Sequence, residues 1–127
     1  MPARDRPTPA PKRASTLSAA QQARVRDLLE PLCVPHADPK VRDKLQYGYR
    51  FEGPAVIFFE RRPHFQTRKW LEEDIAKFRY TKRTGLWSLS CQFRDLKWRA
   101  YEPLPASDDL AELVEELERD PTCIFFG

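Results

Sequence analysis

The chain has 127 residues, of which 41% are hydrophobic and 12% aromatic, which is enough for one domain with a single packed core. This composition excludes a wholly disordered chain, and three cysteines exclude a fully paired disulfide scaffold. No stretch approaches the roughly 18 apolar residues of a membrane span, so we expect a protein of the reducing cytoplasm without a leader or membrane segment.

The net charge of +3 hides an uneven distribution along the chain. Residues 1–101 hold 21 Lys and Arg against 11 acidic residues, whereas residues 102–127 hold Arg119 against eight acidic residues. The basic part favours a polyanionic partner such as nucleic acid. The opposite charges could also pair within the molecule, if an acidic C-terminal helix lies near basic strands. A polyanionic partner and internal charge pairing therefore both remain open.

The N-terminal part begins with a proline-rich basic segment. Residues 1–15 hold four prolines and four basic residues but almost no bulky apolar side chain, so we expect a flexible arm ahead of a single globular domain of residues 16–127. Ser18 and Gln21 have the spacing of a helix capping box, and apolar residues follow at helical spacing: Val25, Leu28, Leu29 and Leu32. This helix is expected to be broken at Pro31, Pro35 and Pro39, and Pro39 to Leu45 has the pattern of a short helical turn.

A change of period to two then predicts strands. Tyr47, Tyr49 and Phe51 share one side of the first strand, and Gly53-Pro54 makes a turn. Residues 55–61 (AVIFFER) are apolar on both faces, which is typical of a central strand. We expect residues 62–74 to form a polar loop anchored by Trp70 and Leu71.

Three further strands are expected to form a meander with turns at residues 82–85 and 94–95. Strict alternation assigns one face to Ala76, Phe78, Tyr80, Trp87, Leu89, Cys91, Phe93, Trp98 and Ala100. We expect this face, including Trp87 and Trp98, to lie in the core. It assigns the opposite face, which holds no carboxylate, to Lys77, Arg79, Thr81, Ser88, Ser90, Gln92, Lys97, Arg99 and Tyr101.

The C-terminal segment reads as a helix and an apolar tail. Ser107, Asp108 and Asp109 open the helix with a capping hydroxyl and first-turn acids, and its apolar stripe is Leu110, Leu113, Val114 and Leu117. Asp120-Pro121 ends it, and residues 123–127 are expected to dock on the domain's own core. The predicted fold is α+β, an antiparallel sheet of about five strands with the N-terminal and C-terminal helices packed on its apolar face.

Several motifs carry a resemblance to a known family. They are Phe59-Glu60-Arg61-Arg62-Pro63, Ala76-Lys77-Phe78-Arg79-Tyr80, Trp87-Ser88-Leu89, Trp98-Arg99-Ala100-Tyr101 and Asp120-Pro121-Thr122-Cys123-Ile124-Phe125-Phe126-Gly127. In these the chain resembles, over roughly residues 20–127, the bacterial family called domain of unknown function 3024. Ser90 and Cys91 stand where that family tends to have aromatic residues. The resemblance implies no activity.

The binding candidates are cations that recur on neighbouring strands, because a concentration of fixed cations attracts phosphate by releasing its counterions. They are Arg61, Arg62, Lys77, Arg79, Lys97 and Arg99. Tyr101, His64 and Phe65 are the aromatic candidates that could stack on unpaired bases. The alternative is a solvated sheet face, partly paired with Glu60 and the acidic helix.

Signals for catalysis, metal or cofactor are weak. Cys33 and His36 have metal-ligand spacing but no second pair, and no glycine-rich phosphate loop exists. Glu72, Glu73 and Asp74 could hold a hard cation or act as acid and base, although adjacent acids in a loop are usually only solvated. We expect no cofactor and no metal.

The function expected from the sequence is therefore a non-enzymatic module that binds nucleic acid through a basic sheet face and the arm. The alternative is a protein-interaction or self-associating domain in which the same arginines meet an acidic protein surface. A third hypothesis is an undetected enzyme with a pocket that holds the acidic loop and His64. The oligomeric state is left open.

Overall fold

The computed structural model describes residues 16–33, 45–64 and 66–126. The expected arm (residues 1–15) and almost all of the expected turn at Pro39 to Leu45 lie outside these residues. The described elements are α1 (Ala19–Cys33), β1 (Gln46–Glu52), β2 (Ala55–Pro63), β3 (Trp70–Thr81), β4 (Leu86–Gln92), β5 (Trp98–Ala100), β6 (Ala106–Ser107) and α3 (Leu110–Arg119). Neither of these helices is long and apolar enough to cross a membrane.

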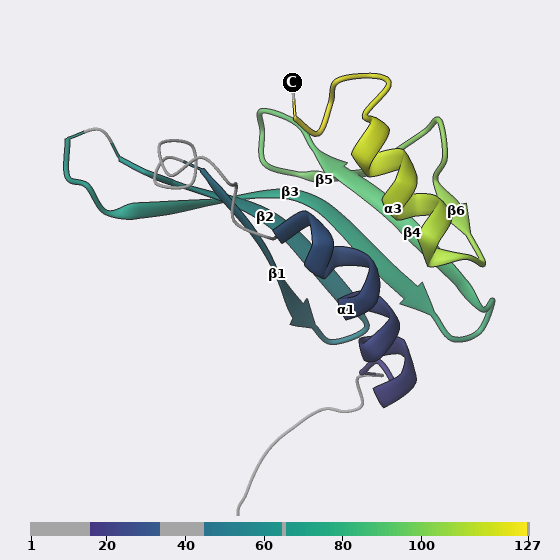
Figure 1. The fold of residues 1–127 in the computed structure, drawn as a ribbon. Coiled ribbons are helices and arrows are strands. Elements are labelled where there is room, and N and C mark those ends of the chain that lie inside the picture. The colour runs from purple at the N-terminus through teal and green to yellow at the C-terminus, as the bar shows by residue number, and fades with distance from the viewer. Residues whose placement is uncertain (1–15, 34–44, 65, 127) are drawn as a thin grey trace, which may run out of the picture.

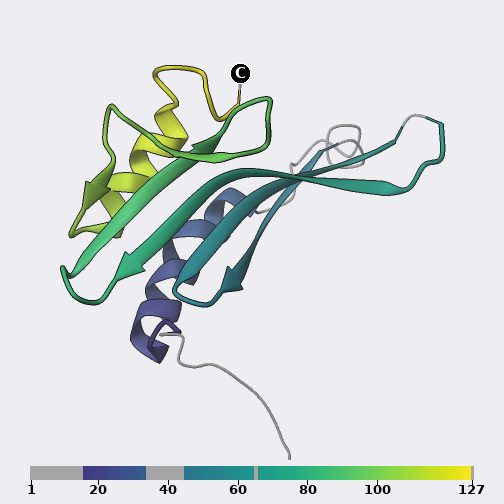
Figure 2. The ribbon, with the colours of Figure 1, turned by 180° about the vertical axis from the view of Figure 1, so that it is seen from behind.

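The strands form one antiparallel sheet in the order β1-β2-β3-β4-β5, with β6 also paired to β4. Both helices lie in front of this sheet in Figure 1 and behind it in Figure 2, so they cover the same face. The predicted α+β fold, with helices from both ends of the chain on one face of an antiparallel sheet, is confirmed.

The start of α1 is as the sequence predicts, but its end is not. Ser18 and Gln21 form a reciprocal capping box, since the Gln21 N–H donates to Ser18 Oγ and the Ser18 N–H to Gln21 Oε1. Pro31 does not break the helix, which runs on to Cys33. Pro31 has no N–H to donate to the carbonyl of Asp27, and the helix continues for only two residues beyond it.

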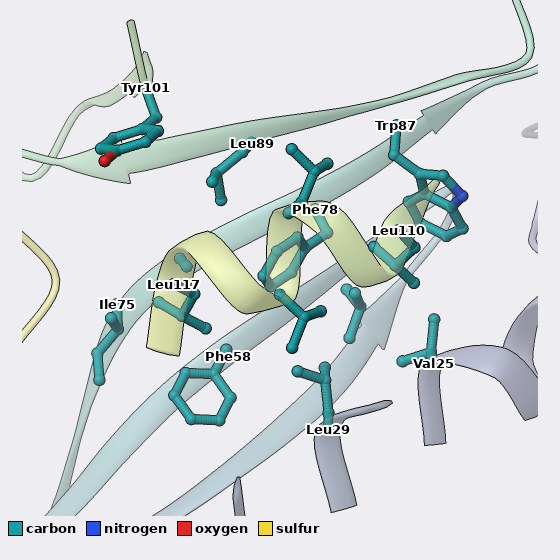
Figure 3. Packing of buried hydrophobic residues seen from close by; sticks show 14 of the residues in the cluster. Val25, Leu29, Phe58, Ile75, Phe78, Trp87, Leu89, Tyr101, Leu110 and Leu117 are labelled. Carbon is teal, nitrogen blue, oxygen red and sulfur yellow. The ribbon is translucent and has the colours of Figure 1, made fainter. Parts of the chain in front are cut away.

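The core lies between the sheet and the two helices (Figure 3). Val25 and Leu29 from α1 and the whole apolar stripe of α3 are buried there, as predicted. The sheet contributes alternate residues of three strands, because side chains alternate across a strand: Val56, Phe58, Ala76, Phe78, Trp87, Leu89 and Cys91.

The polar loop expected over residues 62–74 is largely a β-hairpin. Arg62 pairs with Leu71 and Pro63 with Trp70, so β2 and β3 continue as a two-stranded ribbon that projects from the body (Figure 1). A bulge between Phe58 and Phe59 inserts one residue of β3, Ile75, which turns into the core. The ribbon has solvent on both faces, so its strands lack the apolar alternation by which strands are recognised.

The expected register of β5 is wrong by one residue. Cys91 pairs with Arg99 and Gln92 with Trp98, so Trp98 and Ala100 face away from the helices. The cause is Leu96, whose φ of 62° adds a left-handed residue after a turn closed by the Leu96 N–H and the Phe93 carbonyl. One extra residue moves every following side chain to the other face of the sheet.

The C-terminal segment docks on the core, as expected. The N-cap of α3 is Asp109 and not Ser107, whose hydroxyl donates to Glu112. Asp120 caps the other end, and its carboxylate accepts hydrogen bonds from the backbone N–H groups of Phe125 and Phe126. The tail is thereby folded back, and Phe125 is buried at 5.0 Å, centroid to centroid, from the Tyr101 ring.

Candidate nucleic-acid interface

The face of the sheet opposite the helices, which we call the open face, is covered by no helix of the described chain (Figure 2). Its register brings together side chains from all five main strands. One row across the sheet reads Arg50, Ile57, Lys77, Ser90 and Ala100, and the next reads Glu52, Ala55, Arg79, Ser88 and Ala106. The open face is therefore wide, mixed in polarity and built on a hydrogen-bonded sheet.

Long charged side chains shield the apolar groups of the open face. Ile57 lies directly between Arg50 and Lys77 and is only 1% exposed, although it is not part of the core cluster beneath the helices. Arginine and lysine stems bury apolar surface while their charged ends remain in water. The open face thus presents cations above an apolar floor.

Three aromatic rings on this face each lie under a cation. The Arg50 guanidinium carbon is 5.7 Å from the Phe59 ring centroid, and that of Arg61 is 5.7 Å from the Trp70 ring. The Lys77 ammonium is 5.8 Å from the Trp98 ring. Such pairs combine a flat apolar surface with a positive charge, which are the two features that bind bases and phosphates of single strands.

Gly48 determines where the first of these rings lies. Phe59 pairs with Gly48 across β1 and β2, and its ring covers the glycine. A Cβ atom at residue 48 would come within 2.7 Å of Phe59 Cζ, closer than carbon atoms pack. Glycine is therefore needed here for the close approach of the ring and not for its backbone freedom.

Part of the cationic charge is neutralised within the face. Arg50 binds Asp74 through both terminal nitrogens at 2.9 Å and Glu52 at 2.7 Å, and these hydrogen bonds, those of Asp74 first, raise its pKa above the usual value. Asp74 reaches the open face because β3 begins as early as Trp70, whereas Glu52 is the last residue of β1. Arg61 is less firmly held, since its Nε is 4.0 Å from Glu72 and has no hydrogen-bond partner among the described residues.

Lys77 and Arg79 keep their charge available. Neither forms an ion pair with any residue that the structure describes, and Arg79 is exposed. They lie two residues apart on the central strand β3, facing the hydroxyl groups of Ser90 and Ser88 on β4. This places two free cations beside neutral hydrogen-bonding groups, an arrangement that suits phosphate oxygens.

The other predicted binding residues do not share this site. Arg62 points to the helix side and binds Glu60 at 2.6 Å, and Lys97 lies exposed in the β4–β5 loop. Arg99 is on the helix side, where it binds Asp95 and lies over the Phe93 ring. Tyr101, expected on the basic face, is buried in the core, where its hydroxyl donates to Glu116 at 2.7 Å.

His64 and Phe65 belong to the hairpin tip. His64 Nδ1 accepts hydrogen bonds from the backbone N–H groups of Gln66 and Thr67, so the imidazole helps to shape the turn. Phe65 lies outside the described residues. Neither residue is therefore placed on the open face beside Lys77 and Arg79.

The described residues give little support to catalysis or metal binding. They contain no group of three or more His, Cys, Asp or Glu that could hold a metal ion. Alternation along β3 directs Glu72 and Asp74 to the open face and Glu73 to the other, so the three acids do not converge. Burial, then the charge of Glu30, raises the pKa of the Cys33 thiol to about 11, and His36 lies outside the described part.

Sequence reasoning missed Gly48, Arg50, Phe59, Trp70 and Trp98 as members of this surface. Alternation along β1 and β2 could have found the first three, because each faces away from Phe58. Trp98 needed the true register of β5, and Trp70 needed the true start of β3.

Comparison with known proteins gives a family without an assigned activity. No curated protein and no solved structure shows significant similarity to this chain. The family described as Domain of unknown function (DUF3024) matches residues 17–127, nearly the whole chain. The resemblance seen in the sequence motifs is thereby confirmed, and the chain belongs to the DUF3024 family.

Proposed function

We propose that this protein is a non-enzymatic module that binds single-stranded nucleic acid on the open face. The observation that carries the proposal is the set of three cation–aromatic pairs, Arg50 on Phe59, Arg61 on Trp70 and Lys77 on Trp98, on one sheet face without a helix. Stacking on aromatic rings tolerates any base, so this chemistry favours binding with little sequence preference.

The proposed binding mode assigns a role to each group. A base that stacks on Trp98 displaces the Lys77 ammonium from the ring, and the ammonium then reaches the adjoining phosphate. Arg79 holds the next phosphate, and the Ser90 hydroxyl group donates to phosphate or sugar oxygens. The Ser88 hydroxyl, which donates to the Arg79 carbonyl at 3.4 Å, would exchange that weak hydrogen bond for one to the ligand. Because few phosphates are neutralised, the salt dependence should be moderate, with a slope of about −0.7 per phosphate contact.

Fluorescence anisotropy with a labelled single-stranded oligonucleotide at two salt concentrations tests this proposal. The double variant Lys77→Gln/Arg79→Gln should weaken binding about tenfold, since each lost charged contact is worth roughly 1 kcal/mol or less in water. Trp98→Ala should weaken it by a similar factor through lost stacking.

The matched control is Arg24→Gln/Arg26→Gln, which also removes two positive charges, but from α1 behind the sheet. It should change the affinity less than twofold, by roughly 0.4 kcal/mol or less. Equal losses in the two double variants would show only a response to net charge and would refute the open face as the site. Absence of binding at low salt would refute the function itself.

Self-association is the second candidate. Four exposed apolar side chains, Phe93, Leu96, Ile124 and Phe126, border a hollow of about 480 Å³ beside Glu60 and Glu73. Exposed apolar clusters of this kind are typical of protein contacts. Sedimentation over a range of concentrations tests it, because a single species of monomer mass throughout would refute it.

A further inference from the structure

A second surface lies on the β2–β3 hairpin, away from the centre of the open face. β4 pairs with β3 only as far as Ala76, so β3 runs six residues further, to Trp70, about 20 Å at a rise of about 3.3 Å per residue. β1 pairs with β2 as far as Arg61, which lies opposite Glu72, so only the part of the hairpin beyond these two residues is a ribbon of two strands. Figure 1 shows the ribbon projecting from the body, with neither helix near its end.

Hydrogen bonds join the described residues at the end of this ribbon, His64 and residues 66–69. The His64 N–H donates to the Lys69 carbonyl at 2.8 Å, and the Arg68 N–H donates to the His64 carbonyl at 2.9 Å. His64 Nδ1 accepts from two further backbone N–H groups, and Arg68 has a left-handed φ of 63°. A preorganised tip loses less conformational entropy when it binds a partner.

The chemistry of the tip is cationic and apolar. The sequence from Arg61 to Leu71 contains four Lys or Arg residues and no carboxylate. Trp70 and Leu71 are 39% and 49% exposed, and as neighbours on a strand they face opposite sides of the ribbon. The ribbon therefore carries partly exposed apolar side chains on both sides, and Arg61 lies over the Trp70 ring.

We propose that this tip contacts a groove of double-stranded nucleic acid. A two-stranded β-ribbon fits the major groove, which is about 12 Å wide. The cations Arg68 and Lys69 would face the phosphates on either side, and Trp70 and Leu71 would contact apolar base edges, such as the thymine methyl group. The absence of carboxylates over these residues matches a uniformly anionic partner.

The tip and the open face together define the class of ligand. Trp70 lies on the same side of the sheet as Arg61 and Phe59, because Pro63 pairs with Trp70 and Arg61 with Glu72. A nucleic acid whose single-stranded part lies on the open face could therefore continue as a duplex at the tip. This inference rests on the proposed function for its single-stranded part, and the ligand it names is a duplex with a single-stranded tail.

Anisotropy with three labelled probes tests the inference: a single strand, a blunt duplex and the same duplex with a single-stranded tail. The wild-type protein should bind the tailed duplex about tenfold more tightly than the single strand, as expected for roughly 1.4 kcal/mol of added contacts. The variants Arg68→Asn/Lys69→Gln and Leu71→Ala should abolish this preference without changing single-strand affinity, because none of these residues belongs to the three cation–aromatic pairs of the open face. Asparagine is chosen at residue 68 because it tolerates a left-handed backbone.

The control is Lys82→Gln/Arg83→Gln, which removes the same number of charges from the exposed turn at the other end of β3. It should leave the preference for the tailed duplex intact. Equal wild-type affinity for tailed duplex and single strand would overturn the role of the tip and leave the open face standing. Duplex binding that depends on the tip, without any single-strand binding, would support the tip and refute the open face.

Discussion

The two faces of the sheet are built by neighbouring residues of the same strands, yet they are shielded from water in different ways. Phe58 lies under the helices, where it stacks on Tyr47 and meets the edge of Phe126. Phe59, the next residue, lies over Gly48 and under the Arg50 guanidinium. The helix face is covered by other rigid elements, whereas the open face is covered by side chains that can move away.

This difference suits the two faces to different tasks. Close packing between sheet and helices is sensitive to the loss of single carbon atoms, so that face stabilises the fold. Cations that lie over rings can exchange one partner for another at small cost, because exposed ion and ring contacts are weak. The binding proposed for the open face would therefore leave the core undisturbed.

The sharpest test of the comparison is to truncate the two adjacent phenylalanines. Phe58→Ala should lower the free energy of unfolding by about 3–5 kcal/mol, because it leaves a cavity in the core. Phe59→Ala should lower it by only about 1–2 kcal/mol, since mobile side chains can fill the space. Urea denaturation measures both, and equal losses would mean that the open face is a second core.

A buried polar contact on the helix side gives the next largest effect. The hydrogen bond from Tyr101, and then that from Arg119, holds the pKa of Glu116 below its usual value of 4.5. The contact therefore stabilises the fold above pH 4.5, and this contribution is lost as the pH falls through the lowered pKa. Tyr101→Phe should cost about 1–3 kcal/mol at neutral pH.

In the Tyr101→Phe variant the free energy of unfolding should also fall less steeply as the pH is lowered, because the pKa of Glu116 is then shifted less from its usual value. Thermal unfolding from neutral to acid pH provides the measurement. A loss of stability at acid pH as steep as that of the wild type would show that Tyr101 does not lower the pKa of Glu116.

On the open face, Gly48→Ala should cost about 1–2 kcal/mol, because the new methyl group meets the Phe59 ring. In a Phe59→Ala background the same change should be neutral or stabilising, since alanine suits a strand better than glycine does. A double-mutant cycle measured by urea denaturation shows this coupling. Additive effects would mean that the ring does not rest on the glycine.

The smallest expected effect is at Leu96, in the turn that sets the register of β5 and thereby which of its side chains lie on the open face. Leu96 has a positive φ and is 71% exposed, so Leu96→Gly should stabilise the fold by about 0.5–1 kcal/mol through relief of backbone strain. Thermal unfolding provides the measurement. A loss of stability would indicate that Leu96 makes an apolar contact that outweighs the strain.

Local patterns in the sequence determined most of the elements. The capping box of Ser18 and Gln21 predicts the start of α1, and the apolar stripe from Leu110 to Leu117 identifies the buried side of α3. The alternation of apolar and polar residues identifies the strands. These features depend on residues within one or two turns of each other, so they can be read without the rest of the chain. The fold class follows from them, whereas the family was recognised from its sequence motifs.

Only the tertiary structure decided which side chains meet on the open face. The left-handed residue Leu96 shifts the register of β5, so that Trp98 lies on the open face while Arg99 and Tyr101 lie on the helix side. The hairpin at the end of β2 and β3 places Glu72 and Trp70 on a strand instead of in a loop. Register and strand ends depend on pairing between segments, and a shift of a single residue reverses every face. The composition of the proposed binding surface therefore required the paired sheet, whereas the core beneath the helices did not.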